Sequence, residues 1–300
     1  MKWTTSSLTL HTSNGPFIMG IINITPDSFS DGGRNWNEKH ALRSIKAMIA
    51  AKVDIIDIGG QSTRPGATLI TAKEEWRRIH HILCKTVDLA KGKCLISVDT
   101  FYGDVAAKAL ECGADIINDV SGGNWCQDNT WPVIASHPSC GYVLTHSKGT
   151  PQTMQINPTY QDVVQEVVQD LHKKLSHLTS LGIHPNRVAI DPGIGFGKTT
   201  EHNLTLLNSL QHLKTLKRPI LIGLSRKRFL REILGIPLQS RKTKHLSQLD
   251  QATQILNALL TLKKAAHIWR VHNTDQAQIA AQICRTLSGS TKINLFDKKT

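Results

Sequence analysis

The sequence has no closely spaced pair of cysteines. Its six cysteines are scattered, and we find among them neither a Cys-x-x-Cys pair nor a cysteine–histidine spacing typical of a metal site. They are Cys84, Cys94, Cys112, Cys126, Cys140 and Cys284. This pattern gives no support to a disulfide framework and predicts free thiols in a reducing cytosol.

Long apolar runs are also missing. No stretch approaches the roughly 20 apolar residues that a helix needs to cross a bilayer. The N-terminus lacks an apolar core of about 7 to 15 residues behind a basic start, as a secretory signal would have. We therefore expect no membrane partner and place the protein in the cytoplasm.

Acidic residues are outnumbered, 23 against 36 Lys and Arg, which gives a formal net charge of +13. Such an excess favours anionic partners, from nucleic acid to phosphorylated small molecules. The basic residues gather in patches at 226–228, 241–244 and 298–299, without the interleaved aromatic residues that bind single-stranded nucleic acid. We expect a solvated basic face and no nucleic-acid partner.

Eight short apolar runs, with helical patterns between most of them, set the fold class. Eight strand–helix units in 300 residues predict a single (β/α)8 TIM barrel over 17–288. Residues 1–16 form an N-terminal extension compatible with a hairpin, and 289–300 form a polar tail. Irregular structure is expected at 121–138, and a loop at 241–245 ahead of a helix starting near Leu246. The predicted strands are 17–22, 53–58, 94–98, 115–117, 141–144, 187–190, 219–223 and 267–271.

Polar residues or glycines follow every predicted strand. In a barrel of this class the active site is built at the carboxyl ends of the strands, so these residues should meet at one rim. Each alone could be a helix cap or a turn residue. They are Asn23, 59–64, Asp99 and Thr100, 118–121, Thr145 and His146, 191–193, 225–227, and Arg270 with His272.

The first of these loops, within 19–33, carries two carboxylates, several hydroxyls and the aromatic Phe29. It is either a ligand-handling loop or a well-hydrogen-bonded turn. The glycine-rich stretch 191–199 is not a P-loop, because three residues rather than four separate Gly193 from Gly197, and it is not a Gly-x-Gly-x-x-Gly motif. ATP and NAD are thereby disfavoured. A ligand-binding loop and a tight turn both remain open.

Two sets of side chains suggest a ligand. Carboxylates, an amide and a cation suit a flat nitrogen heterocycle with amino and oxo groups, and arginines, a histidine and hydroxyls suit a phosphate or pyrophosphate. Asn23 and Asp27 could help to hold a Mg²⁺ ion that mainly binds substrate phosphates. The first set is Asp99, Asn118, Asp191 and Lys227; the second is Thr63, Arg64, Arg270 and His272.

The ordered motifs resemble those of the dihydropteroate synthase family over roughly residues 17–285. The first contains Thr-Pro-Asp-Ser-Phe-Ser-Asp and the second Ser-Thr-Arg-Pro. Any one motif would be weak, but eight in order, one at each strand end, are specific. They lie at 18–33, 57–66, 97–100, 116–122, 146–151, 191–199, 223–227 and 270–272.

The resemblance implies condensation of 7,8-dihydropterin pyrophosphate with p-aminobenzoate to 7,8-dihydropteroate, by an SN1-like mechanism with Mg²⁺, in a homodimeric enzyme of folate biosynthesis that sulfonamides target. It implies that the pterin is held by Asp99, Asn118, Asp191 and Lys227. The residues that bind the pyrophosphate and the metal would be Asn23, Arg64, Arg270 and His272, with Ser225 among the substrate-binding residues. The p-aminobenzoate site comprises Phe29, Asp31, Thr63, Pro65 and Phe196, with the first loop as a lid whose Asn23 base binds the metal.

Several positions depart from the family pattern. Gln61 stands where Glu is usual, and Thr145 and Ser147 flank His146 where Met is usual. Arg228 and Asn273 replace Ser and Asp; a guanidinium at 228 could bind the p-aminobenzoate carboxylate or block it. Three other hypotheses therefore stay open: a divergent non-catalytic pterin-binding paralogue, a pterin-dependent methyltransferase barrel, which should lack the first two loops, and a nucleic-acid-binding module, which rests on charge alone.

Overall fold

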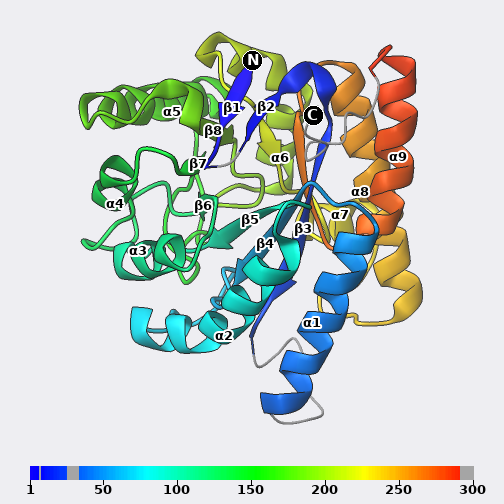
Figure 1. The fold of residues 1–300 in the computed structure, drawn as a ribbon. Helices are drawn as coiled ribbons and strands as arrows, with labels where there is room; N and C mark the ends of the chain where they lie inside the picture. Colours follow the sequence, from blue (N-terminus) through cyan, green and yellow to red (C-terminus); the bar gives the residue numbers. More distant parts are fainter. Residues whose placement is uncertain (7, 26–33, 291–300) are drawn as a thin grey trace.

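Eight parallel strands form a barrel in the computed structural model, which describes residues 1–6, 8–25 and 34–290 (Figure 1). Neighbours run in the order β8-β7-β6-β5-β4-β3-β10-β9, and a bridge between Ile190 and Ile220 brings the two edges together. The predicted (β/α)8 fold is confirmed. The strands are β3 (Phe17–Asn23), β4 (Ile55–Gly59), β5 (Leu95–Asp99), β6 (Ile116–Asp119), β7 (Gly141–Thr145), β8 (Val188–Asp191), β9 (Leu221–Ile222) and β10 (Ile268–Val271).

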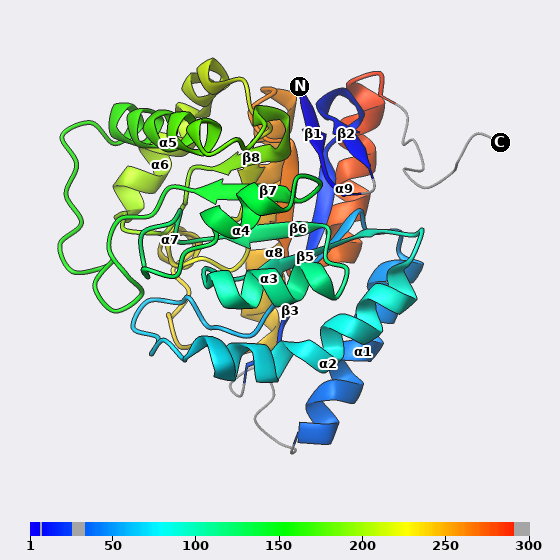
Figure 2. The ribbon, with the colours of Figure 1, turned by 60° about the vertical axis from the view of Figure 1, so that its left-hand side comes forward.

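Helices cover the outside of the barrel (Figures 1 and 2). The fourth unit is irregular except for one short helix, α4, and α8 begins at Thr243, so the expectation of a loop up to 245 is wrong. Within the described ranges, no helix combines the length and apolarity that a membrane span requires. The helices are α1 (Arg34–Ala50), α2 (Ala72–Ala90), α3 (Gly103–Glu111), α4 (Trp131–Ser136), α5 (Val163–Ser180), α6 (Thr200–Asn208), α7 (Arg228–Ile233), α8 (Thr243–Leu262) and α9 (Thr274–Leu287).

A short antiparallel hairpin precedes the barrel and packs against its amino-terminal end. It pairs β1 (Lys2–Thr4) with β2 (Thr9–His11). Trp3 and Leu10 are buried in one cluster with residues from the first half of the barrel strands, among them Met19 and Ile268. The Trp3 indole also donates a hydrogen bond to the carbonyl of Arg187, 2.9 Å away. The hairpin therefore closes the end of the barrel opposite the strand-end loops.

Alternation along the strands divides the barrel interior into two levels. Side chains at every second strand position face inward. In β4 and β5 the first inward residues, Ile55 and Leu95, are apolar, and the next, Asp57 and Ser97, are polar. The same change occurs in other strands. Those pairs are Ile116 and Asn118, Val143 and Thr145, Ala189 and Asp191, and Ile268 and Arg270. The apolar level supports the barrel and the polar level forms the candidate site.

Candidate active site

Arg270 of β10 lies at the centre of the polar level. Its Nε donates a hydrogen bond to Asp57 Oδ2 and its Nη2 donates one to Asp99 Oδ2, and both donor–acceptor distances are 2.6 Å. Asp57 is completely buried and Asp99 is 6% exposed. One guanidinium therefore links strands β4, β5 and β10 across the barrel. The sequence motifs predict Arg270 at the pyrophosphate and Asp99 at the heterocycle, whereas the structure makes these two residues direct partners.

Asp57 organises this cluster, although sequence analysis did not select it. Its Oδ1 accepts a hydrogen bond from Ser97 Oγ at 2.6 Å, and its Oδ2 accepts one from Asn118 Nδ2 at 3.1 Å as well as that from Arg270. The sequence did hold a signal. Asp57 is the one charged residue within β4, two positions before Gly59, on the face that alternation turns inward.

Burial changes the acid–base properties of this cluster. It raises the pKa of Asp99 to about 7, and the nearby Arg270 only partly opposes that change. Burial alone would lower the pKa of Arg270, but the charges of Asp57 and Asp99 outweigh it and raise that pKa. Arg270 therefore remains a cation, and Asp99 can gain or lose a proton near neutral pH. A ligand that donates hydrogen bonds to Asp99 would favour the carboxylate.

Asp191 and Lys227 form the second polar group. The Asp191 Oδ1 accepts a hydrogen bond from the amide of Gly193 at 2.7 Å, and the Lys227 ammonium donates to the carbonyl of Ile194. Burial raises the pKa of Asp191 and lowers that of Lys227 to about 8, and each charge opposes the shift of the other. Lys227 Nζ also lies 4.7 Å from the centre of the Phe196 ring.

Gly223 shows that the two groups face one space. A Cβ built on Gly223 would lie 3.8 Å from Lys227 Nζ and 4.0 Å from both Asp191 Oδ2 and the Arg270 Cβ. Since β9 offers no side chain here, a planar ligand could approach the backbone between the carboxylates and the cations. The structure thus brings together four residues predicted to hold the heterocycle: Asp99, Asn118, Asp191 and Lys227.

The glycine-rich loop after β8 is held by a buried lysine that sequence analysis overlooked. Lys198 Nζ lies 2.8 Å from His146 Nδ1 and donates to the carbonyls of Gly193 and Phe196 at 3.0 and 3.1 Å. Burial lowers the pKa of Lys198 to about 7 and that of His146 to about 2. A Cβ at Gly193 would lie 1.8 Å from the carbonyl oxygen of His146, so the turn requires glycine. The loop is therefore both a tight turn and one wall of the site.

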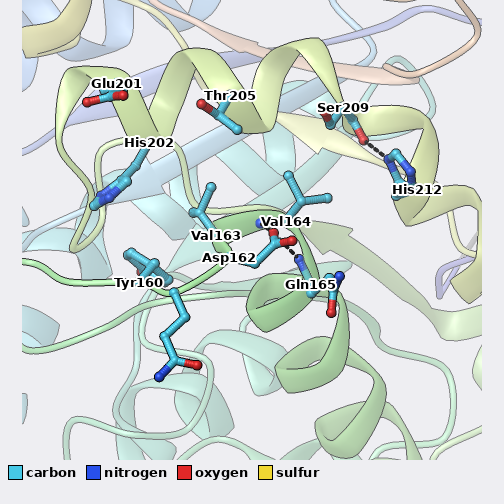
Figure 3. A pocket seen from close by; sticks show the side chains of 11 residues that line it. Tyr160, Asp162, Val163, Val164, Gln165, Glu201, His202, Thr205, Ser209 and His212 are labelled. Carbon is cyan, nitrogen blue, oxygen red and sulfur yellow. Dashed lines mark hydrogen bonds between the residues drawn. The ribbon is translucent and has the colours of Figure 1, made fainter.

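An outer cavity of about 570 Å³ lies between the starts of α5 and α6 (Figure 3). Its wall includes Tyr160, whose ring meets that of His202 edge-on, with 5.0 Å between ring centres, and lies 6.2 Å from that of His146. None of the residues predicted for the active site lines it. The polar barrel level therefore remains the better candidate for chemistry.

His272 and Ser225 meet at the last strand end. His272 Nδ1 lies 2.9 Å from Ser225 Oγ. Burial, and then the nearby arginines, lower the pKa of His272 to about 3, so the ring is neutral at physiological pH. The positive charge expected of His272 is absent, and the ring can act only through hydrogen bonds. Next to it, Asn273 accepts from the Gln276 amide and caps α9.

The second loop, between β4 and α2, carries the half-buried Thr63 and the exposed Arg64 and Pro65. Gln61 fixes this loop, because its Oε1 accepts from the Ile70 amide at 2.8 Å and its Nε2 donates to the Ser62 carbonyl at 2.7 Å. A Glu at this position could make the first of these bonds but not the second, which needs the amide N–H.

Asn23 ends β3 beside Gly59. The other residues predicted in the first loop, Asp27, Phe29 and Asp31, lie outside the described residues. The lid expected there is therefore not part of the site described above.

The remaining family departures have distinct environments. Thr145 and Ser147 are buried on either side of His146, and Thr145 Oγ1 has no hydrogen-bond partner within the described residues. Arg228 has a side chain that is 54% exposed, and its Nε lies 2.6 Å from Glu232 Oε1. Its guanidinium is therefore directed along α7 in an exposed ion pair, which argues against a block of the site.

Comparison with known proteins connects this arrangement to one family. A family model described as "Pterin binding enzyme" matches residues 19–272. The chain is 41% identical to a folate synthesis bifunctional protein of Arabidopsis thaliana, covering 91% of this chain and 57% of that protein. It spans about half the length of the bifunctional plant relatives that it matches.

Relatives of similar length also match. A dihydropteroate synthase of Synechocystis is 39% identical, with 90% of this chain and 88% of the relative covered. Among solved structures, the dihydropteroate synthase of Xanthomonas albilineans with 4-aminobenzoic acid is 34% identical. It superposes with a TM-score of 0.82, covering 97% of this chain and 99% of that one.

The Asp57→Ala variant should lose about 3 kcal/mol or more of unfolding free energy, because it removes one partner of a buried ion pair. Ser97→Ala removes only a neutral donor to the same carboxylate and should cost about 1 kcal/mol. Urea unfolding followed by circular dichroism measures both. Equal small losses in the two variants would show that the Arg270–Asp57 pair does not stabilise the barrel.

Two histidines should each make the protein less stable in mild acid, an effect that the raised pKa of Asp99 opposes. The unfolded chain protonates histidine near pH 6.5, whereas His146 and His272 stay neutral in the folded state until about pH 2 and 3. The unfolded state therefore binds more protons between these limits, and each histidine should cost about 2 kcal/mol of stability at pH 5 relative to pH 7. His272→Gln should flatten this loss in pH-dependent urea unfolding, and His172→Gln, at an exposed position, should leave it unchanged.

Proposed function

The chain belongs to the dihydropteroate synthase family of pterin-binding enzymes, and we propose that it condenses 7,8-dihydropterin pyrophosphate with p-aminobenzoate to give 7,8-dihydropteroate and pyrophosphate. The observation that carries this proposal is the polar level inside the barrel. It combines two carboxylates that can accept from a ring, an amide and two cations, and Gly223 places no side chain between Asp191, Lys227 and Arg270.

Recognition of the pterin rests on hydrogen-bond complementarity. Asp191 and Asp99 would accept from the amino and ring N–H groups, Asn118 can donate and accept, and Lys227 would donate to the oxo group. Because Asn118 also donates to Asp57 at 3.1 Å, its orientation is set before a ligand arrives. Phe196, 8% exposed, would cover the aromatic ligands. Thr63, Pro65, Phe29 and Asp31 remain the residues that we propose for p-aminobenzoate.

The leaving group would lie at the outer rim. Arg64 and the neutral His272 can donate hydrogen bonds to pyrophosphate oxygens, and Ser225 orients the His272 ring. Arg270 would lie between the pyrophosphate and the pterin. Asn23 fits a Mg²⁺ ion, since it offers an amide oxygen at a strand end, and Mg²⁺ commonly takes one or two protein oxygens plus substrate phosphates. Bound there, Mg²⁺ would neutralise charge on the departing pyrophosphate.

The chemistry follows from this division. The bond between the pterin methylene carbon and the pyrophosphate oxygen breaks first, and the electron pair leaves with pyrophosphate. The resulting cation is delocalised over a ring that the carboxylates Asp99 and Asp191 face, which stabilises its positive charge. The aniline nitrogen of p-aminobenzoate then attacks the methylene carbon and loses a proton. No nucleophilic side chain of the protein is needed.

The same features weigh against the alternatives. The chain keeps both the first and the second loop motif, which a corrinoid-linked methyltransferase barrel should lack. A nucleic-acid module is disfavoured because Arg226 and Arg228 of one basic patch form ion pairs with Asp250 and Glu232. A non-catalytic paralogue would retain the heterocycle pocket, so only turnover separates it from the synthase.

We propose that the protein is a cytoplasmic homodimer. Apolar side chains line the outer faces of α8 and α9, which pack side by side (Figure 1). They recur at helical spacing and are between 46% and 68% exposed, so a second copy of this surface would remove them from water. They are Ile255, Leu259, Leu262, Ile279, Ile283 and Leu287.

Purified protein with Mg²⁺ should form dihydropteroate from the two substrates. Asp99→Ala and Lys227→Ala should each lower turnover by about 100-fold or more, because each removes a group that contacts the pterin. Gln61→Glu keeps the acceptor for the Ile70 amide and should remain active, as should the exposed Lys244→Ala. Pterin pyrophosphate that binds without product at saturating p-aminobenzoate would instead identify a non-catalytic paralogue.

Analytical ultracentrifugation should give twice the 33.2 kDa chain mass. The double variant Leu259→Arg, Ile283→Arg should sediment as a monomer, since it places charges in the apolar surface on both helices. The matched variant Ile156→Arg changes an isoleucine that is 72% exposed on another surface and should remain dimeric. A monomeric wild-type protein at micromolar concentration would contradict the dimer.

A further inference from the structure

A cluster of metal-binding side chains lies on the outside of the barrel, away from the site described above. His80 and Cys84 are one turn apart on α2, and Cys112 directly follows α3. The two Sγ atoms are 2.9 Å apart, and the ligand atoms of all three residues lie within 4.8 Å of one another. The helices that carry them run side by side (Figure 2).

The three side chains are placed so that all of them could bind one metal ion. Residues four apart on a helix share one face, which sets His80 and Cys84 toward the same point. The His80 ring lies against Trp76, with 4.8 Å between ring centres, and the Cys112 amide donates to the Lys108 carbonyl at the end of α3. Both cysteines are half-buried and His80 is exposed, so an ion can enter from solvent.

We propose that His80, Cys84 and Cys112 form a binding site for a thiophilic divalent cation, Zn²⁺, with a solvent molecule as the fourth ligand. Two thiolates and one imidazole are a common zinc ligand set. Two thiols each lose a proton to solvent as two Zn–S bonds form, and the two thiolate charges balance that of the ion. No change of oxidation state takes place.

The distances fit this ion after a small adjustment. Zn–S bonds of about 2.3 Å in a tetrahedron place two sulfurs about 3.8 Å apart, and a sulfur and an imidazole nitrogen about 3.5 Å apart. The Sγ–Sγ distance would have to increase from 2.9 Å by about 0.9 Å. The ligand atoms of the three residues lie within 4.8 Å of one another, a range that includes both required separations. Side-chain rotation of Cys112, at a helix end, can supply that movement.

Cys84 and Cys112 are free thiols, which could bind a cation or form a disulfide. The nearby imidazole favours the cation, because a disulfide has no use for His80 whereas a metal site does.

A metal ion at this site would stabilise the fold and take no part in the reaction. Thr71, which follows the second loop, caps α2 by accepting from the Glu74 amide. A cation that joins the far part of α2 to the end of α3 would restrain the helix on which that loop ends. The cysteines are scattered along the sequence and free in the structure, but the fold places Cys84 and Cys112 side by side.

The test uses the untagged, full-length, metal-free protein, kept reduced with a phosphine. Zn²⁺ is titrated against a chromophoric chelator, and Co²⁺ serves as a spectroscopic probe. We expect one Zn²⁺ per chain, a thiolate-to-cobalt charge-transfer band, and protection of Cys84 and Cys112 from alkylation as read by peptide mass spectrometry. Zn²⁺ should also raise the melting temperature.

Matched variants assign these signals. Cys112→Ser and His80→Ala should each weaken Zn²⁺ binding at least about tenfold, since loss of an outer-shell partner alone costs about 10- to 100-fold. Cys126→Ser, at another half-buried cysteine, and His81→Ala, whose ring pairs with Glu38 instead, should bind as the wild type does. Circular dichroism checks that each variant is folded.

The proposal is overturned if the reduced wild-type protein binds no Zn²⁺ more tightly than the Cys112→Ser variant. It is equally overturned if the His80→Ala variant binds Zn²⁺ as tightly as the wild type, because the two thiols alone would then account for the binding. A third contrary result is a protein that binds no Zn²⁺ and, when glutathione disulfide is added, only forms a Cys84–Cys112 disulfide. None of these outcomes depends on turnover, so the proposed synthase activity can fail or succeed independently.

Discussion

The guanidinium of Arg270 makes a polar barrel interior possible. Asp57 and Asp99 point into a space that most proteins fill with apolar side chains, and a buried carboxylate without a partner is strongly unfavourable. With Arg270 at 2.6 Å from both, and Ser97 and Asn118 donating to Asp57, each charge has a partner in place. Because these partners come from four strands, the pairing also fixes how the strands meet at the rim.

The apolar level beneath this cluster provides the support that the polar level cannot. Trp3 and Leu10 of the hairpin complete a cluster with the first inward residues of the strands, such as Met19 and Ile55. The barrel is therefore stabilised at its amino-terminal end by burial and organised at its carboxyl end by charge pairing. At the carboxyl end, Gly193 allows its turn to approach the His146 carbonyl closely, and Gly223 leaves the backbone of β9 without a side chain.

Little of the net positive charge of the chain is concentrated at the candidate site. Arg226 pairs with Asp250, and Arg228 with Glu232, while burial lowers the pKa values of Lys198 and Lys227 toward neutrality. In the polar level, Arg270 meets two carboxylates, Asp57 and Asp99, and Lys227 lies near the third, Asp191. Selectivity for a pterin pyrophosphate then rests on the position of donors and acceptors rather than on a general attraction to anions.

Local sequence determined the strands, most of the helices and the polar residues that follow each strand, because alternation and strand-end chemistry depend on neighbours in the chain. Contacts across the barrel were decided by tertiary structure. The pairs Asp57 with Arg270, His146 with Lys198, and Cys84 with Cys112 join residues that are 213, 52 and 28 positions apart. Periodicity carries no information about such distant pairs, and only the packing of the whole fold brings them together.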